Sequence, residues 1–506
     1  MADNKASVKG ITTFHLTMLA LGTVVGGSFF LGSGVAIKAA GPSILFSYIL
    51  GGLLIYVILY ALSEMTAADP VPGSFRTYAE RSFGRGVGFV TGWVYWIGLI
   101  LAMSSESIAA STFLRAWFPN FPEVAMGMLI IVAITLLNLL GANYLSKLES
   151  GLAAVKLLAV VGFIVIGLAL IAGLVPGAPA AGVGELRGEA WFPGGFAGVA
   201  GSMLIVIFTY AGFEVIGLAA SEVENPKKTI PRAINMTLIT LVGLYIAAIA
   251  VILMLYPTQG MIADQSPLVL ALTRWGMGWA GTLINIVMIT AILSTMLAST
   301  FGLARMLRSL AAEGHAPGWL KDRHDIPYKG ILFSGAAMLF GLAMGYLLPQ
   351  QVYLFLVSCG GFSLLFSYFI ILASHYRWRR TTPCSPEAAC QLPGYPYTSW
   401  AGLIGMVGIL VSMPFISGQG AGLVVGLSLV ALLAGIYWVK SRFTREAARG
   451  AQPRGGAARL GASARLAGPQ IEAAEEISGG RERREAAREA DGKDAGPKAE
   501  SPQSEK

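Results

Sequence analysis

Long apolar runs recur along most of this chain and decide what it can fold into. Each run holds about 20 residues with almost no charge, the length that an α-helix needs to cross roughly 30 Å of hydrocarbon. Backbone N–H and C=O groups find no water inside a bilayer, so such runs fold as membrane-spanning helices. We predict an all-α integral membrane protein with twelve transmembrane helices. Their approximate ranges are 14–37, 42–66, 86–113, 124–142, 150–173, 198–221, 231–256, 278–303, 330–348, 351–374, 399–417 and 419–440.

The start of the chain does not read as a signal peptide. Lys5 and Lys9 form a polar lead before the first apolar run, but no cleavage-site pattern follows, and further runs come after it. We therefore predict a retained helix at 14–37. Composition agrees with the membrane class, because 55% of the residues are hydrophobic and only 13% are charged.

The placement of lysine and arginine predicts the orientation. An even number of spans puts both ends of the chain on one side, and the loops on that side carry fifteen Lys and Arg residues against four on the other. Those four are Lys38, Arg115, Arg187 and Arg274. By the positive-inside rule, we predict that both termini lie in the cytoplasm. We also predict that the protein lies in the plasma membrane. The net charge of +8 thus reflects topology, and nucleic-acid binding is not predicted.

The predicted domain organisation has three parts. Residues 1–13 are a cytoplasmic N-terminus, and 14–440 form the twelve-helix domain. Residues 441–506 are rich in Ala, Gly, Arg and Glu, with Phe443 as the one aromatic residue. Such a segment cannot bury enough apolar surface to fold alone, so we predict a disordered cytoplasmic tail.

Metal, redox and enzyme chemistry have no support in the sequence. The three cysteines lack a CxxC spacing. No nucleophile–base pair or metal-ligand spacing occurs at membrane depth, so we predict neither an enzyme nor a cofactor. The histidines lie at span ends or in loops, without a carboxylate clustered nearby in the sequence, and we predict that they are interfacial or solvated. They are His15, His315, His324 and His375.

Two of the predicted spans are interrupted. Gly26–Ser28 lies within the first span and Tyr210–Glu214 within the sixth, and helical hydrogen bonding is easily broken at both. In lipid, unpaired backbone groups are tolerated only where they line a protein cavity or meet a ligand. Interrupted spans at corresponding positions of two halves indicate the binding site of a secondary transporter. We interpret the chain as a carrier; the alternative is that both segments are Gly-rich surfaces for helix packing.

Three segments resemble bacterial amino-acid permeases of the amino acid–polyamine–organocation superfamily. They are Leu19–Ser43, Phe208–Ile234 and Arg305–Pro317, which stand in the order and spacing of that family. The resemblance covers about residues 10–440, which is nearly everything except the tail.

The resemblance implies a leucine-transporter-type fold. In that fold spans one to five and six to ten form two inverted repeats, here about 14–173 and 198–374, and 399–440 adds two helices. The interrupted spans are the first and the sixth, five helices apart, which agrees with this symmetry.

The two interruptions predict the substrate site. Backbone N–H groups from Gly26 to Phe29 lose their helical partners and can bind a substrate carboxylate, aided by the dipole of a half-helix. Freed carbonyl groups in the sixth span can accept hydrogen bonds from an α-ammonium, and Phe208 matches the family's aromatic lid over the substrate. The predicted substrate-binding residues are Gly26, Gly27, Ser28, Phe29, Phe208, Thr209, Tyr210, Ala211 and Gly212.

The chain departs from the family pattern at two places. Gly26–Ser28 reads Gly-Gly-Ser where the family usually has Gly-Ser-Gly or Gly-Thr-Gly, so one hydroxyl moves by one position. In the eighth span, Leu297–Ser299 aligns with the usual Asn-Ser-Gly. Both departures change side-chain contacts to the substrate, whereas the backbone contacts of the first break survive.

Three charged residues are predicted well inside the spans: Glu106, Lys156 and Glu214. Because an unpaired ion at bilayer depth is expensive, such residues face a cavity and pair. Lys156 resembles the fifth-helix lysine of proton-coupled relatives, whose ammonium takes the place of a sodium ion and can exchange a proton in each cycle. Glu214 matches an acidic position tied to gating or proton sensing, and Glu106 is predicted to compensate the lysine. The alternative is a structural salt bridge joining helices three, five and six.

These features predict a proton symporter that imports neutral amino acids, aliphatic or aromatic, by alternating access. The aromatic residues Phe208, Tyr210 and Phe213 near the site, without a second unpaired carboxylate, argue against basic amino acids. An exchanger and a non-transporting amino-acid sensor are the alternatives. The charge of Lys156 disfavours a sodium-coupled carrier, and two broken helices around a small central site disfavour a channel. The oligomeric state is not predicted.

Overall fold

The computed structural model describes residues 11–71, 73–220, 223, 225–262, 265–322, 326–347, 352–381, 392–416 and 418–450. Most of the predicted N-terminal segment, the predicted tail beyond Gly450, and His324 lie outside the described residues. The described residues up to Val439 form one compact unit, and those from Lys440 onward belong to a second unit.

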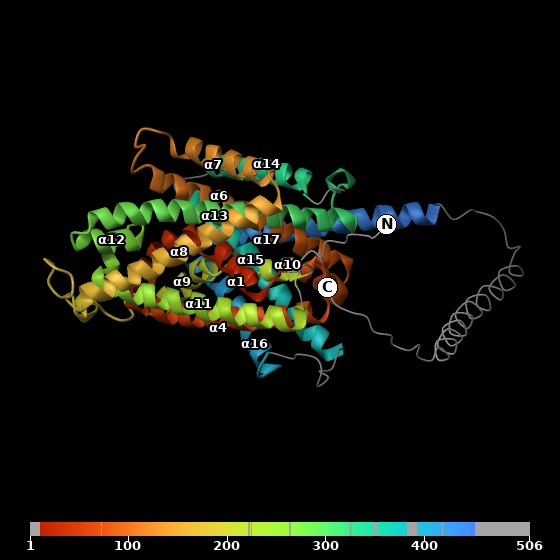
Figure 1. The fold of residues 1–506 in the computed structure, drawn as a ribbon. Helices are drawn as coiled ribbons and strands as arrows, with labels where there is room; N and C mark the ends of the chain where they lie inside the picture. The colour runs from red at the N-terminus through yellow and green to blue at the C-terminus, as the bar shows by residue number, and fades with distance from the viewer. Residues whose placement is uncertain are drawn as a thin grey trace, which may run out of the picture. The chain divides into compact units, whose positions relative to one another are not determined.

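Helices form almost all of the described structure, and several of the long ones, such as α4, α11 and α13, run roughly along one direction (Figure 1). Within the described ranges the β-structure is limited to an isolated bridge between Ile11 and Val223. The helices are α1 (Thr13–Val24), α2 (Gly27–Phe30), α3 (Gly32–Ala40), α4 (Ile44–Ala68), α5 (Ser74–Phe83), α6 (Arg85–Leu114), α7 (Glu123–Asn138), α8 (Ala142–Ile171), α9 (Gly195–Thr209), α10 (Val215–Ala219), α11 (Pro226–Leu255), α12 (Pro267–Arg274), α13 (Gly278–Ala312), α14 (Tyr328–Leu347), α15 (Val352–Thr381), α16 (Tyr397–Ser412) and α17 (Gly420–Gly450).

Eight helical stretches of the described chain are long and apolar enough to cross a membrane. They are Gly27–Ala68, Arg85–Leu114, Gly151–Ile171, Pro226–Leu255, Gly278–Ala312, Tyr353–Thr381, Tyr397–Phe415 and Gly420–Arg442. Four shorter apolar helices are Thr13–Val24, Glu123–Asn138, Gly195–Thr209 and Tyr328–Met344. At least one helix lies at each of the twelve predicted spans, whereas the number of crossings and the inverted repeat stay predictions.

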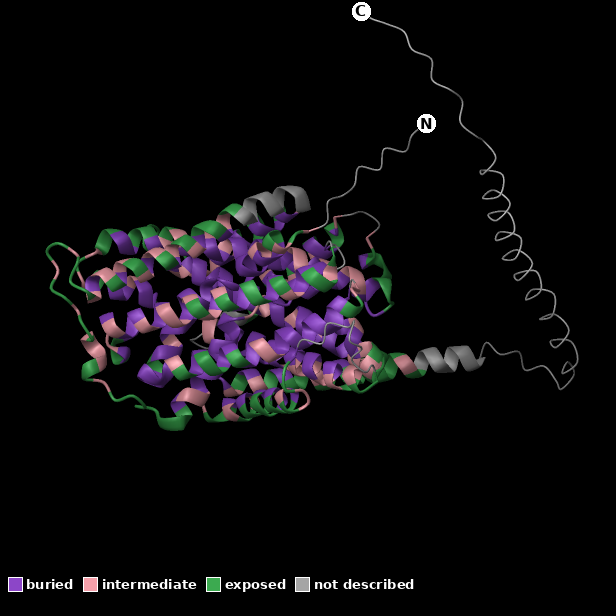
Figure 2. Ribbon diagram, turned by 60° about the horizontal axis from the view of Figure 1, so that its bottom comes forward, coloured by how far each residue is buried: buried purple, intermediate pink, exposed green. Residues whose placement is uncertain are grey.

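The outer faces of the first unit are apolar, as a lipid environment requires. Buried residues fill the interior of the bundle and exposed ones lie along its outer faces and loops (Figure 2). Large apolar side chains such as Leu158, Ile239 and Phe340 are about two-thirds exposed or more. An apolar surface of this kind indicates contact with a membrane.

Both predicted interruptions are confirmed. The first apolar run is divided because Val25 and Gly26 are extended between α1 and α2. The second interruption separates α9 from α10, and Gly212 lies within it at a φ of 114°. This left-handed backbone favours glycine, and a Cβ at Gly212 would also lie 2.8 Å from the carbonyl oxygen of Thr23.

The prediction that the histidines are interfacial or solvated is wrong for His375 and His315. His375 on α15 is fully buried, and its Nε2 lies 2.8 Å from a carboxylate oxygen of Glu64 on α4. His315 is also buried, with its Nε2 3.7 Å from Glu80 on α5. Both acids lie far away in the sequence, so no local pattern could reveal them. His15 is exposed, in agreement with the prediction.

Candidate substrate site at the two helix breaks

A buried carboxylate occupies the amide side of the first break. The Gly27 N–H donates to Oε2 of Glu106 at 2.7 Å, and the Ser28 N–H donates to Oε1 at 2.9 Å. Glu106 comes from the middle of α6 and is only 2% exposed. Two parallel, charge-assisted hydrogen bonds are the arrangement by which backbone N–H groups hold a carboxylate. The first break is therefore built to bind a carboxylate group.

A buried ammonium meets the carbonyl side of the same break. Lys156 on α8 is fully buried, and its Nζ donates to the carbonyl oxygen of Gly22 near the end of α1. Nζ also lies 3.4 Å from Oγ1 of Thr295 on α13. The Thr295 hydroxyl lies 3.4 Å from the Gly22 carbonyl oxygen and 3.2 Å from that of Val25. The carbonyl end of a helix favours a positive charge. Opposite charges thus occupy the two ends of the break.

The carboxylate of Glu214 accepts hydrogen bonds at the second break, between α9 and α10. Oε2 of Glu214 accepts the N–H of Gly212 at 3.0 Å. The hydroxyl of Tyr95 on α6 donates to Oε1 at 3.1 Å, and the hydroxyl of Tyr368 on α15 donates to Oε2 at 3.1 Å. Glu214 is 1% exposed. Two of these three donors, the hydroxyl groups of Tyr95 and Tyr368, tie the second break to two neighbouring helices.

A small cavity lies between the two breaks. Its lining combines polar groups of the breaks with apolar side chains of α6, α9 and α15. The lining residues are Thr23, Val24, Ser28, Leu99, Ala102, Met103, Glu106, Phe208, Ala211, Gly212, Thr295, Ser299 and Leu364. The space open to the centre of a water-sized sphere is about 20 Å³, close to that of one water molecule. The cavity therefore has room for about one water molecule in this conformation.

Comparison with known proteins decides the family. The profile of the amino acid permease family matches residues 15–449. This chain belongs to the amino acid permease family. It is 33% identical over 449 residues to the uncharacterized amino acid permease YtnA of Bacillus subtilis (strain 168), covering 87% of this chain and 96% of the relative. The permease is thus a multi-pass membrane protein of a transporter family, rather than of an enzyme family.

Two further relatives have more specific names. The gamma-aminobutyric acid permease of Bacillus subtilis (strain 168) is 30% identical, over 84% of this chain and 93% of its own length. The aromatic amino acid transport protein AroP of Escherichia coli (strain K12) is 32% identical, over 80% of this chain and 89% of its own length.

The amides of the first break differ in part from the prediction. The sequence predicts that the N–H groups from Gly26 to Phe29 lack partners, but those of Gly27 and Ser28 are bound to Glu106. The Phe29 N–H donates to the Gly26 carbonyl at 3.2 Å, because the helix restarts immediately after Gly26. The Gly27 and Ser28 N–H groups thus lack helical partners and bind a carboxylate, as predicted, although it belongs to Glu106, and the prediction is wrong for the Phe29 N–H group.

The hydrogen bonds of Glu106 add to its predicted role, since Lys156 also interacts with it electrostatically. The sequence predicts that it compensates Lys156, whereas its hydrogen bonds in the described structure go to the two amides. Lys156 donates to the Gly22 carbonyl in addition to its electrostatic interaction with Glu106. The physical reason is that each end of the broken helix offers a charged group a partner of its own.

The carbonyl groups of the sixth span are less open than predicted. The Phe208 carbonyl accepts the N–H of Ala211 at 3.1 Å, and the Thr209 carbonyl accepts the hydroxyl of Tyr245 at 3.2 Å. The hydroxyl of Thr23 donates to the Gly212 carbonyl at 3.0 Å, which connects the two breaks directly.

The predicted site residues separate into two groups. Ser28, Phe208, Ala211 and Gly212 line the cavity with Glu106. The other five predicted residues are not among those that line the cavity. Gly26 and Gly27 form the backbone of the first break, and the Thr209 carbonyl accepts the Tyr245 hydroxyl. The ring of Phe29 stacks on that of Tyr245 with ring centres 4.1 Å apart. The ring of Tyr210 packs edge-on to that of Tyr48, with ring centres 6.0 Å apart.

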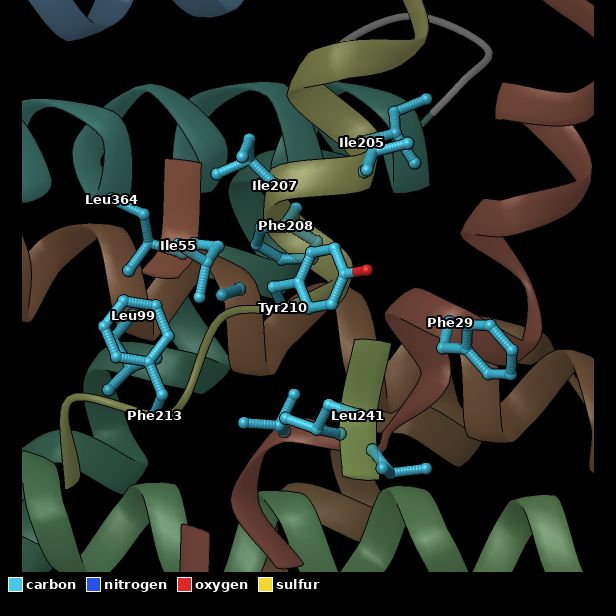
Figure 3. Close-up of a cluster of buried hydrophobic side chains, with 14 of the residues drawn as sticks. Phe29, Ile55, Leu99, Ile205, Ile207, Phe208, Tyr210, Phe213, Leu241 and Leu364 are labelled. Atoms are coloured by element: carbon cyan, nitrogen blue, oxygen red, sulfur yellow. The ribbon is translucent and has the colours of Figure 1, made fainter. Parts of the chain in front are cut away.

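Sequence reasoning missed most of the apolar wall of the cavity. Figure 3 shows Leu99, Phe208 and Leu364 in one cluster of buried side chains from α6, α9 and α15. Leucine in an apolar span carries no signal of its orientation, so these positions could not be found. Thr295 was also missed; its hydroxyl inside an apolar run was the available clue.

Proposed function

We propose that this permease is a secondary active transporter that imports neutral L-amino acids, aliphatic or aromatic, by proton symport with alternating access. The observation that carries the proposal is the pair of N–H groups at Gly27 and Ser28, which hold a carboxylate beside the cavity. The same two donors suit the carboxylate of an amino acid. The predicted plasma-membrane location belongs to this proposal.

The cavity lining supports a neutral substrate. Leu99, Met103, Phe208 and Leu364 form an apolar wall opposite the polar groups of the breaks. Apart from Glu106, the described lining carries no charged side chain. A site with an apolar wall and a few convergent polar groups suits a small molecule with an apolar side chain. The name of the relative AroP points in the same direction.

The buried charges support proton coupling. Lys156 and Glu106 each hold one end of the first break, and Glu214 holds the second. A change of protonation at any of them removes or adds a charge where the backbone depends on it. Proton uptake can therefore change the geometry of the breaks, which alternating access requires.

The architecture proposed with this function follows the family resemblance. All twelve apolar segments cross the membrane, as inverted repeats at about 14–173 and 198–374 with two further helices at 399–440. Both termini are cytoplasmic, and 441–506 is a disordered tail. The excess of basic residues in the loops on one side supports this orientation.

Uptake into proteoliposomes tests the function. A panel of labelled amino acids is offered with and without an inward proton gradient, to the wild type, to Lys156→Ala and to Lys38→Ala, which replaces an exposed lysine on α3 as a control. We expect gradient-dependent accumulation of neutral amino acids in the wild type and the control, and its loss in Lys156→Ala.

Other outcomes would point to the alternatives. Uptake that requires internal amino acid but no gradient would show an exchanger. Stabilisation by an amino acid without any flux would show a sensor. Accumulation that is the same with and without the proton gradient, and the same in Lys156→Ala as in the wild type, would refute the proposed coupling. Lys156 would then have only a structural role.

A further inference from the structure

Glu106 occupies the donors that the proposed substrate needs. Its two carboxylate oxygens take the N–H groups of Gly27 and Ser28, one each, at 2.7 and 2.9 Å. Each N–H group makes one strong hydrogen bond, so two carboxylates cannot hold this pair at the same time. The side chain is also packed directly on the backbone, because a Cβ at Gly27 would lie 2.7 Å from Oε2.

We propose that Glu106 is a built-in competitor for the substrate's carboxylate, and that the substrate binds by displacing Glu106 as this residue takes up a proton. The inference rests on the proposed function and names the residue that couples proton to substrate. Two N–H···O bonds to Glu106 break and two to the substrate form. The proton comes from the external solution and ends on a carboxylate oxygen of Glu106.

The surroundings of Glu106 explain why the proton is needed. Once it leaves the amides, its neighbours in the cavity include the apolar Ala102 and Met103 of its own helix, and the hydroxyl groups of Thr23 and Thr295 already donate to backbone carbonyl groups. An ionised carboxylate without donors is far more costly there than a neutral carboxylic acid. The displaced side chain therefore leaves as the acid, and the substrate carboxylate replaces the lost negative charge.

The charged and titratable groups that face Glu106 come from three other helices. They are Lys156 on α8, Tyr245 on α11 and Tyr353 on α15. Lys156 donates to the Gly22 carbonyl at the opposite end of the break, and α13 presents only the hydroxyl groups of Thr295 and Ser299 to the cavity. The carboxylate of Glu214 instead accepts hydrogen bonds from the hydroxyl groups of Tyr95 and Tyr368. Glu106 is thus the acid whose bonds the substrate must break.

Equilibrium binding to the full-length protein in detergent tests the proposal. The probes are L-alanine, L-leucine and L-phenylalanine, measured with the wild type, Glu106→Gln, Glu106→Asp and the control Glu123→Gln on α7. The Gln side chain offers one acceptor and one donor to two N–H groups, so it cannot hold the pair. We expect Glu106→Gln to bind the best probe on the order of tenfold more tightly than the wild type at neutral pH, and Glu123→Gln to match the wild type.

The pH dependence separates competition from a merely structural role. Proton uptake on binding makes the wild type bind more tightly as the pH falls, whereas the affinity of Glu106→Gln stays flat. In a weakly buffered solution, the wild type takes up protons when the probe is added, and Glu106→Gln does not. Infrared difference spectra of the wild type gain a carboxylic acid C=O band on probe addition, and this band shifts in Glu106→Asp. The infrared measurement keeps the proposal testable if Glu106→Gln fails to fold.

Several results would overturn the proposal. Loss of probe binding in a folded Glu106→Gln protein would make Glu106 a substrate contact instead of a competitor. Unchanged affinity with unchanged proton uptake, or no probe binding by either protein, would also refute it. Tighter binding by Glu106→Gln together with no gradient-driven uptake by the wild type would refute the proposed symport and leave the competition standing.

Discussion

Glu106 and Lys156 hold the opposite ends of the break in the first helix. The carboxylate accepts the N–H groups of Gly27 and Ser28, and the ammonium donates to the Gly22 carbonyl. Helix ends leave N–H and C=O groups without intrahelical partners, and each charge sits at the end whose dipole favours it. Both charges therefore stabilise a break that would be costly at bilayer depth without partners.

Gly27→Ala is expected to disturb the substrate site while leaving the fold in place. Its Cβ would lie 2.7 Å from Oε2 of Glu106 and 3.0 Å from the Cβ of Ala109, so the carboxylate must leave the amides and their geometry must shift. We expect initial uptake by proteoliposomes to fall by about tenfold, a loss of roughly 1.4 kcal/mol. Gly243→Ala on α11 is the matched control, since its Cβ meets nothing within 4 Å. Wild-type uptake by Gly27→Ala would contradict the role of this backbone.

Gly212→Ala is expected to destabilise the second break. The φ of 114° suits glycine, and the new Cβ would lie 2.8 Å from the Thr23 carbonyl oxygen. Strain of this kind costs on the order of 1–3 kcal/mol. The thermal unfolding midpoint in detergent should fall, whereas Gly302→Ala on α13, where an added Cβ meets nothing within 4 Å, should leave it unchanged. Equal midpoints for the two variants would argue against a strained break.

Tyr95→Phe and Tyr368→Phe should each weaken the network around Glu214. Each change removes one hydroxyl donor from a buried carboxylate oxygen, which costs about 1–3 kcal/mol. Because both tyrosines act on one group, the two losses should not add in the double variant. Unfolding free energies measured with and without Glu214→Gln provide the cycle. Full additivity, or identical losses in the Glu214→Gln background, would show that the hydroxyl groups act independently of Glu214.

Glu80 on α5, outside the spans, should make stability depend on pH. Burial raises the pKa of Glu80 above its usual value of 4.5, and the Glu313 carboxylate adds to this effect while the Arg76 guanidinium opposes it. The folded protein then keeps a proton that the unfolded chain has released, so stability falls as the pH rises through the raised pKa. The midpoint of Glu80→Gln relative to the wild type should therefore rise as the pH increases from about 4.5.

A second variant checks the Glu80 prediction. Glu80→Asp retains a titratable carboxyl group at the same position, so its midpoint should follow the pH dependence of the wild type. A constant difference between Glu80→Gln and the wild type over this pH range would show that Glu80 does not titrate there.

Hydropathy and local chemistry predicted the helices and their interruptions well. Each apolar run coincides with at least one helix, and the breaks occur at Gly26 and around Gly212 as glycine placement indicated. Such features depend on contiguous residues, since the length of a run and the backbone freedom of glycine act locally.

The partners of the buried charges could not be predicted. Glu106 lies 79 residues from Gly27 in the chain, and Tyr368 lies 154 residues from Glu214. The sequence indicates that such charges require partners and predicts that Glu106 compensates Lys156, but it does not indicate the amide groups that hold the carboxylate. His375 shows the same limit, because Glu64 is 311 residues away.

The sequence by itself determined the membrane class, the positions of the helices and the two places where the backbone leaves the helix. These follow from apolar length and glycine, which act within one segment. Tertiary structure decided that Glu106 fills the amides of Gly27 and Ser28, that Tyr95 and Tyr368 hold Glu214, and which leucines face the cavity. The reason is that a buried charge goes to whichever donors the packing of distant helices brings within hydrogen-bond reach.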